Sequence, residues 1–158
     1  MNLKKCIFFV PFGILLGHII CQQGLIVDLA KISITVNLAP PGSTKQLRTT
    51  LGHTGYYRKF IKGYAQITKP LEKLLKKDIK YKWIEECQWS FDTLKEKMVI
   101  APILVFPDWT KEFHVHVDAS FIALGINLAQ QGEGDIDYPI YFLSRKLSTA
   151  KKNYTMTE

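Results

Sequence analysis

The sequence predicts an α+β protein, with a β-hairpin first, helices in the middle, and three strands followed by a helix at the end. Two apolar runs near the N-terminus flank a turn signal, which is typical of a hairpin. One set of apolar residues recurs at the spacing of a single helix face: Cys87, Phe91, Leu94 and Met98. From residue 113 onwards, apolar and polar residues alternate with the two-residue period of a strand.

The N-terminal apolar runs, residues 7–10 and 14–20, are predicted to pair around a turn at Pro11-Phe12-Gly13. The stretch also resembles a signal peptide, because Lys4 and Lys5 precede it. Proline and glycine interrupt it, and no small-residue cleavage site follows. A small secreted or membrane-anchored protein therefore remains an alternative, and an intracellular location without membrane contact is favoured.

Three widely spaced cysteines form neither a disulfide framework nor a zinc motif, which agrees with a reducing compartment.

Helices are expected between residues 43 and 101. Ser43 or Thr44 can cap the first helix, after the Pro40-Pro41-Gly42 break. The apolar stripe of this helix is expected to continue as far as residue 61: Leu47, Leu51, Thr54, Tyr57, Phe60 and Ile61. A second helical stretch covers Lys69 to Lys77, with Pro70 in its first turn. The third helix carries the stripe that begins at Cys87.

The last part of the chain is predicted to form a three-stranded sheet. Its strands are residues 113–118, 121–129 and 138–143, and a final helix begins at Ser148 or Thr149. If the first strand is central and the helix crosses the sheet, Asp118 and Glu158 can converge. Two such carboxylates would suit a hard divalent cation. The alternative is that Asp118 merely ends its strand at a turn. His114 and His116 have no evident third ligand and are expected at the surface or in an interface.

Positive charge is concentrated in one block of the chain. The whole chain has a formal net charge of +7. Residues 43–82 hold eleven Lys or Arg and two acids, a balance of +9. Within the block, aromatic and basic residues interleave on what is expected to be a helix: Tyr56, Tyr57, Arg58, Lys59 and Lys62. Such a surface can contact phosphates. The alternatives are a solvated helix face and tyrosines that belong to the core.

The order of motifs resembles the polyprotein of gypsy-type long-terminal-repeat retrotransposons over essentially the whole chain. The resemblance is carried by these segments: Lys5 to Phe9, Leu15 to Ile20, Gly24 to Asp28, Leu47 to Gly52, Gly55 to Ile61, Pro70 to Lys77, Trp83 to Pro102, Pro107-Asp108, Asp118-Ala119-Ser120, Pro139-Ile140, Ser144 to Leu147 and Asn153 to Glu158. Some positions depart from the family pattern. Among them is Asn127, which interrupts a strand where an apolar residue is usual; a buried amide there needs partners.

The resemblance implies four regions. Residues 1–30 would be the end of the reverse transcriptase palm with its primer-grip hairpin, and residues 31–82 the helical thumb. Residues 83–110 would be the connection with its helix. Residues 111–158 would hold the first three strands and first helix of a truncated RNase H-like fold.

The parent enzyme implied by this resemblance copies RNA into DNA and hydrolyses the RNA of RNA–DNA hybrids, using Mg²⁺. Asp118 and Glu158 would be the first two of its RNase H metal ligands. Gly17, His18, Tyr57, Arg58, Lys59 and Lys62 would contact the primer–template or hybrid. The other metal-binding carboxylates have no counterpart in this chain, so we expect no activity and no tight Mg²⁺ binding from it alone. A non-catalytic basic nucleic-acid-binding remnant is the alternative function.

Overall fold

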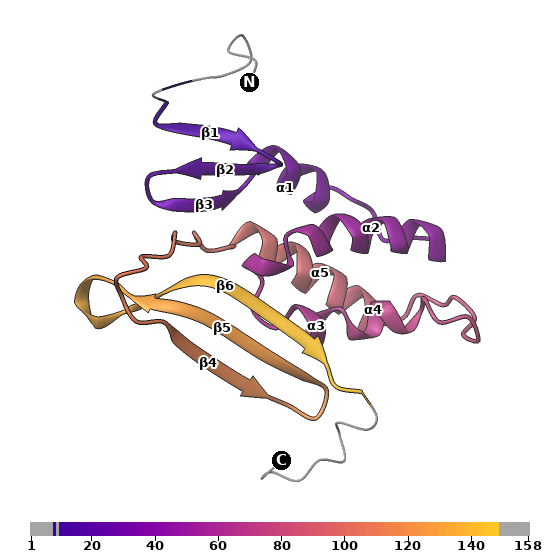
Figure 1. Ribbon diagram of the computed structural model, residues 1–158. Coiled ribbons are helices and arrows are strands. Elements are labelled where there is room, and N and C mark those ends of the chain that lie inside the picture. The colour runs from indigo at the N-terminus through magenta and orange to yellow at the C-terminus, as the bar shows by residue number, and fades with distance from the viewer. Residues whose placement is uncertain (1–7, 9, 149–158) are drawn as a thin grey trace.

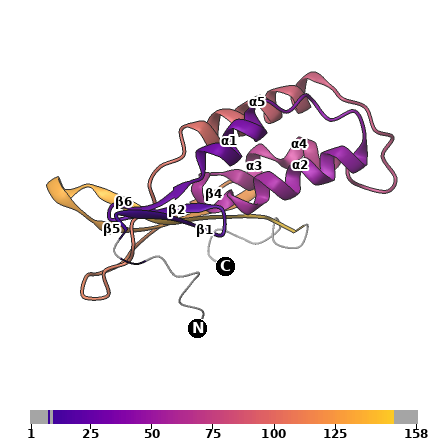
Figure 2. The same ribbon diagram turned by 90° about the horizontal axis from the view of Figure 1, so that it is seen from above.

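The computed structural model describes residue 8 and residues 10–148. The helices and strands follow in this order: β1 (Phe12–Leu15), β2 (His18–Cys21), β3 (Gly24–Val27), α1 (Leu29–Val36), α2 (Thr44–Tyr56), the 3₁₀ turn η2 (Arg58–Phe60), α3 (Tyr64–Ile67), α4 (Lys69–Lys73), α5 (Glu85–Val99), β4 (His114–Ala119), β5 (Ala123–Gln131), the 3₁₀ turn η3 (Glu133–Asp135) and β6 (Asp137–Lys146). The predicted α+β class is confirmed. Figure 2 shows the two sheets in one layer, with the helices gathered on one side of it.

The N-terminal sheet has the order β1-β2-β3, and all its strands are antiparallel. The hairpin in the structure pairs β1 with β2, and the predicted turn is wrong, since Phe12 and Gly13 lie in β1 and the chain reverses at Leu16 and Gly17. Their φ angles are 49° and 70°. Two successive residues with positive φ form the two-residue turn that matches the twist of paired strands, and this outweighs the Pro-Phe-Gly signal. Most of the predicted first strand lies outside the described residues, and β3 was not predicted.

The helices largely follow their capping and spacing signals. Ser43 caps α2 by accepting a hydrogen bond from the Gln46 backbone N–H at 3.3 Å. Pro70 lies in the first turn of α4, which is shorter than predicted. The predicted stripe of α5 is buried along its whole length. Helix α1 was not predicted; Asp28 caps it through the Ala30 N–H at 3.0 Å. Among the described residues, no helix is both long and apolar enough to cross a membrane.

Two apolar clusters form the core. The first joins the N-terminal sheet, α1, η2 and α5, and Phe142 of β6 packs against it: Val27, Ile32, Tyr57, Phe60, Ile61, Leu94, Met98 and Leu104. The second lies between α2, α4 and α5: Leu47, Leu71, Leu74, Cys87 and Phe91. The first cluster therefore connects both sheets to the helical layer (Figure 1).

The C-terminal sheet has the order β4-β5-β6, so β5 is its central described strand. The prediction that the first strand is central is wrong within these strands, because they follow one another as an antiparallel meander. The predicted half-burial of its apolar residues also fails, since Val115 is 59% exposed and Val117 61% exposed. The helical layer contacts this sheet through β6, where α3 and η2 pack, and His116 and Asp118 of β4 are exposed as well. Lys62 and Gln66 share a cavity with His116 and Asp118.

The segment after α5 links the two sheets. Leu104 exchanges backbone hydrogen bonds with Leu25 of β3, at 2.8 and 3.0 Å. The next N–H, from Val105, donates to the Pro139 carbonyl of β6 at 2.9 Å. On the helical side, the Ala65 N–H donates to the Ser144 hydroxyl at 2.9 Å. The helical layer and both sheets are therefore held together by polar contacts as well as by the core.

Candidate nucleic-acid interface

The turn between β1 and β2 is held by side chains from 40 residues further along the chain. The Leu16 carbonyl accepts hydrogen bonds from the Tyr56 hydroxyl and, at 2.9 Å, from His18 Nδ1. The neighbouring Gly17 carbonyl accepts one from the Tyr57 hydroxyl at 2.9 Å. Three donors thus converge on two successive carbonyls, and the turn lies against the C-terminal end of α2.

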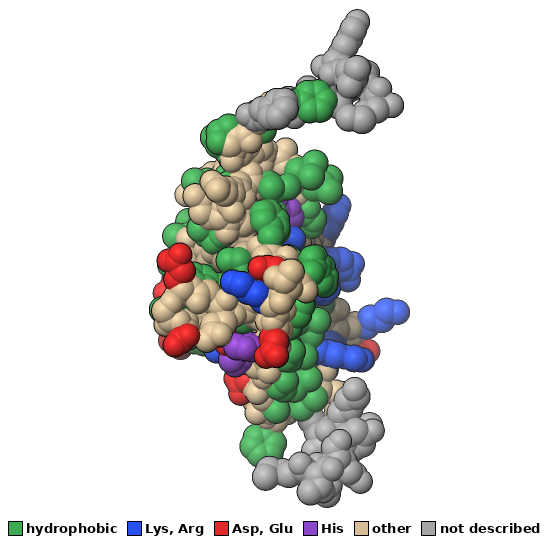
Figure 3. All heavy atoms as spheres, turned by 60° about the vertical axis from the view of Figure 1, so that its left-hand side comes forward, with side chains coloured by type: hydrophobic (Ala, Val, Ile, Leu, Met, Phe, Trp, Pro, Cys, Tyr) green, Lys and Arg blue, Asp and Glu red, His purple; other side chains and the backbone are tan. Residues whose placement is uncertain are grey.

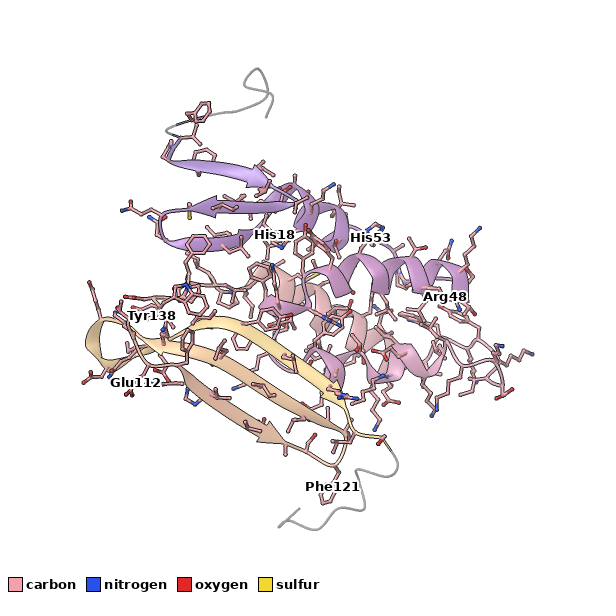
Figure 4. All side chains as sticks on the ribbon, viewed as in Figure 1. His18, Arg48, His53, Glu112, Phe121 and Tyr138 are labelled. Carbon is pink, nitrogen blue, oxygen red and sulfur yellow. The ribbon has the colours of Figure 1, made fainter. Side chains whose placement is uncertain are left out.

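His18 is buried in an aromatic cage beneath this turn (Figure 4). Its ring stacks on Phe60 at 5.7 Å between centroids, and it lies 5.1 and 5.5 Å from the rings of Tyr56 and Tyr57. Burial, and next the positive charge of Lys59, lower the pKa of His18. Its Nε2 is buried and has no hydrogen-bond partner. A neutral ring that donates through Nδ1 suits these surroundings, so His18 is placed to shape the turn.

Lys59 lies beside this cage, and the predicted basic residues do not share one helix. Arg58 and Lys59 belong to η2, and Lys62 follows it. Arg58 and Lys62 are exposed. The Lys59 Nζ lies 5.6 Å from the centre of the Phe60 ring, and burial lowers the Lys59 pKa. Figure 3 shows Lys and Arg side chains along one edge of the face that it draws.

Tyr56 and Tyr57 differ in exposure, and only one of them is placed as predicted. Tyr57 was expected to face nucleic acid, yet its side chain is buried and its hydroxyl is used by the turn. Tyr56 is 51% exposed and supplies the accessible ring. The alternative that one tyrosine belongs to the core therefore describes Tyr57. The apolar stripe predicted to run as far as residue 61 already includes Tyr57, and the burial of its side chain agrees with that stripe.

Asp118 is exposed on β4 and lines a cavity of about 400 Å³ between the sheet and the α3 region. Lys62 and Gln66 form one side of this cavity, and His116 and Asn127 lie on the other. Glu158 falls outside the described residues, so its convergence with Asp118 stays a prediction. Within the described part of the chain, no group of three or more His, Cys, Asp or Glu is placed to hold a metal ion. One carboxylate does not make a Mg²⁺ site.

His114 and His116 share a partner that the sequence did not suggest. His114 Nδ1 lies 2.7 Å from one oxygen of Asp137, and His116 Nε2 lies 2.6 Å from the other. The hydrogen bonds from His114 and then from His116 lower the pKa of Asp137. These short contacts are hydrogen bonds that span β5, the strand between β4 and β6. The expectation of ordinary surface histidines therefore misses this contact, because it depends on strand register.

Asn127 interrupts its strand at a cost that the sequence predicts, because its Oδ1 is buried and has no hydrogen-bond partner among the described residues. We expect Asn127→Val to raise the free energy of unfolding by about 1–2 kcal/mol, since it removes an unsatisfied polar atom and adds a β-branched residue to a strand. Urea denaturation of the two proteins measures the difference. A lower stability of the variant would show that the amide has a partner in solution.

Comparisons with known proteins show what this chain is similar to. Residues 83–158 match the family described as the RNase H-like domain found in reverse transcriptase. The Pol polyprotein of Drosophila melanogaster transposon 297 is 39% identical over 163 residues, which cover 100% of this chain and 14% of that polyprotein. The Schizosaccharomyces pombe transposon Tf2-3 polyprotein is 33% identical over 158 residues, covering 100% of this chain and 12% of its own length.

The fold also resembles solved structures. The foamy viral protease–reverse transcriptase in complex with RNA/DNA hybrid superposes with a TM-score of 0.81 at 23% identity, covering 98% of this chain and 21% of that one. The same viral protein with double-stranded DNA gives a TM-score of 0.80 and covers 97% and 32%. The predicted resemblance to gypsy-type polyproteins is confirmed. The chain belongs to the Pol polyproteins of retrotransposons and corresponds to part of their reverse transcriptase and RNase H-like region.

Proposed function

We propose that this chain forms a nucleic-acid-contacting part of its polyprotein, spanning the end of the palm (residues 1–30), the thumb (31–82), the connection (83–110) and the start of RNase H (111–158). Its partners would be a primer–template or RNA–DNA hybrid and the remaining parts of the polyprotein. The observation that carries the proposal is the contact between turn and basic segment. The Tyr57 hydroxyl donates to the Gly17 carbonyl, and the Phe60 ring contacts both His18 and Lys59, so the turn lies beside η2.

In this proposal, Gly17 presents backbone to the nucleic acid, and Arg58, Lys59 and Lys62 contact phosphates. His18 and Tyr57 do not contact the nucleic acid directly in this proposal, because both are buried. They support the turn through hydrogen bonds to its carbonyls. The positive balance of residues 43–82 supports the proposal, since neutralisation of phosphates releases counterions and strengthens binding at low salt. In the parent enzyme Asp118 and Glu158 would ligate Mg²⁺. For this chain itself we propose binding rather than catalysis.

Charge reversal at two exposed positions tests the proposal. We expect Arg58→Glu with Lys62→Glu to weaken binding of an RNA–DNA hybrid by about 10²-fold at low salt. The salt dependence, as the slope of log K against log salt concentration, should flatten by about two, because two phosphate contacts are lost. Fluorescence anisotropy over a salt series measures both quantities.

The matched control reverses the same amount of charge outside the basic block, with Lys97→Glu and Lys111→Glu. Both residues are exposed. We expect this control to retain most of the slope and affinity. Equal losses in the two double variants would show that only net charge matters, and would contradict a localised interface.

A further inference from the structure

The turn at Leu16 and Gly17 has a strained backbone. Leu16 has a φ of 49°, which brings the Cβ of an L-residue close to its own backbone. Its side chain is 78% exposed, so packing of that side chain does not hold the conformation. Strained residues persist when their surroundings fix them, and they cluster at functional positions. Contacts from outside the hairpin therefore add to the strand pairing that holds this turn.

The hydroxyls of Tyr56 and Tyr57 supply that support. They donate to the Leu16 and Gly17 carbonyls, while His18 donates to Leu16 from within the hairpin. We call these two hydroxyl contacts the clasp. Burial, and next the negative charge of Asp28, raise the pKa of Tyr57, which keeps its hydroxyl protonated as a donor.

The contact is also sterically close. A Cβ added to Gly17 would lie 3.1 Å from the Tyr57 hydroxyl and 3.7 Å from Cε1 of Tyr56. Glycine thus supplies both the positive φ and the space for the tyrosines. Because Tyr56 ends α2 and Tyr57 precedes η2, the position of the turn is tied directly to the segment that carries Arg58.

We infer that Tyr56 and Tyr57 are positioning residues, which fix the turn of the N-terminal hairpin against the basic segment so that both engage one nucleic-acid backbone. This inference rests on the proposed function. The two tyrosines act through the turn and add no charge. Their loss should therefore change how often the turn is in its binding shape, and not how many phosphates are contacted.

The test compares Tyr56→Phe/Tyr57→Phe with the wild-type chain and with Tyr64→Phe. The control also loses one hydroxyl contact, from Tyr64 to Thr54 at 3.1 Å, in the same helical layer and away from the turn. We expect the double variant to bind an RNA–DNA hybrid about tenfold more weakly at every salt concentration, with an unchanged salt slope. Amide hydrogen exchange of residues 15–18 should accelerate relative to that of α5. Tyr64→Phe should change neither quantity.

The outcomes separate the clasp from the proposed function. Unchanged exchange at residues 15–18 in the double variant would overturn the clasp, whatever the affinities are. Faster exchange with wild-type affinity would overturn the positioning role but leave the interface intact. A wild-type chain without salt-dependent binding would refute the proposed function and, with it, the positioning role. Faster exchange would then still show that the hydroxyls hold the turn.

Discussion

Replacing Gly24 with alanine is expected to lower the free energy of unfolding by about 3 kcal/mol, which corresponds to a drop of about 6–12 °C in Tm for a chain of this size. Gly24 opens β3 with a φ of 141°, a conformation that L side chains rarely adopt. An added Cβ would lie 2.3 Å from the Leu104 carbonyl oxygen. That oxygen belongs to the backbone and already accepts from the Leu25 N–H at 2.8 Å.

The clash cannot be relieved locally, because the next residue along, Val105, is bonded to Pro139 of the other sheet. Movement of this segment would therefore weaken both ends of the link between the sheets. Gly52→Ala is the matched control, since nothing lies within 4 Å of its added Cβ. Gly52 is inside α2, so alanine there should stabilise by about 0.5–1 kcal/mol. Thermal and urea unfolding measure both variants, and equal effects would contradict the steric argument.

Sequence reasoning succeeded where one local signal decides the structure. The buried face of α5 follows from spacing alone, because four apolar residues at helical intervals can share only one side. The cap of α2 follows in the same way from Ser43. Both features depend on residues within a few positions of one another. Neighbours distant in the sequence do not change them.

Sequence reasoning failed where contacts between distant segments of the chain decide the structure. The hairpin turn lies at Leu16 and Gly17, whose carbonyls accept hydrogen bonds from tyrosines 40 residues away. The predicted stripe includes Tyr57, but the hydrogen bond of its hydroxyl to the Gly17 carbonyl spans 40 residues and could not be predicted. The contact of His114 and His116 with Asp137 depends on the register of three strands. The alternation in β4 correctly predicted a strand, but not that its apolar side is exposed among the described residues. Periodicity identifies two faces and does not say which one another element covers.

The second large expected effect is that of truncating Phe60, which belongs to the first core cluster. Phe60 is 1% exposed, and its ring contacts the rings of His18 and Tyr57. Phe142 of β6 packs against the same cluster. We expect Phe60→Ala to lower the free energy of unfolding by about 3–5 kcal/mol, the usual cost of a buried phenylalanine truncated to alanine. Phe121→Ala should change it by less than about 0.5 kcal/mol, since that ring is 92% exposed.

The segments that lose protection from hydrogen exchange are more informative than the size of the loss in free energy of unfolding. Phe91 is equally buried but belongs to the second cluster, away from the hairpin. Phe91→Ala should therefore cost a similar free energy, about 3–5 kcal/mol, without loosening the turn selectively. Hydrogen exchange distinguishes the two variants: Phe60→Ala should accelerate exchange in β2 and β6 more than in α5, and Phe91→Ala should not. If both variants gave the same exchange pattern, the chain would unfold as one unit, and Phe60 would not be a specific link between the turn, the basic segment and the C-terminal sheet.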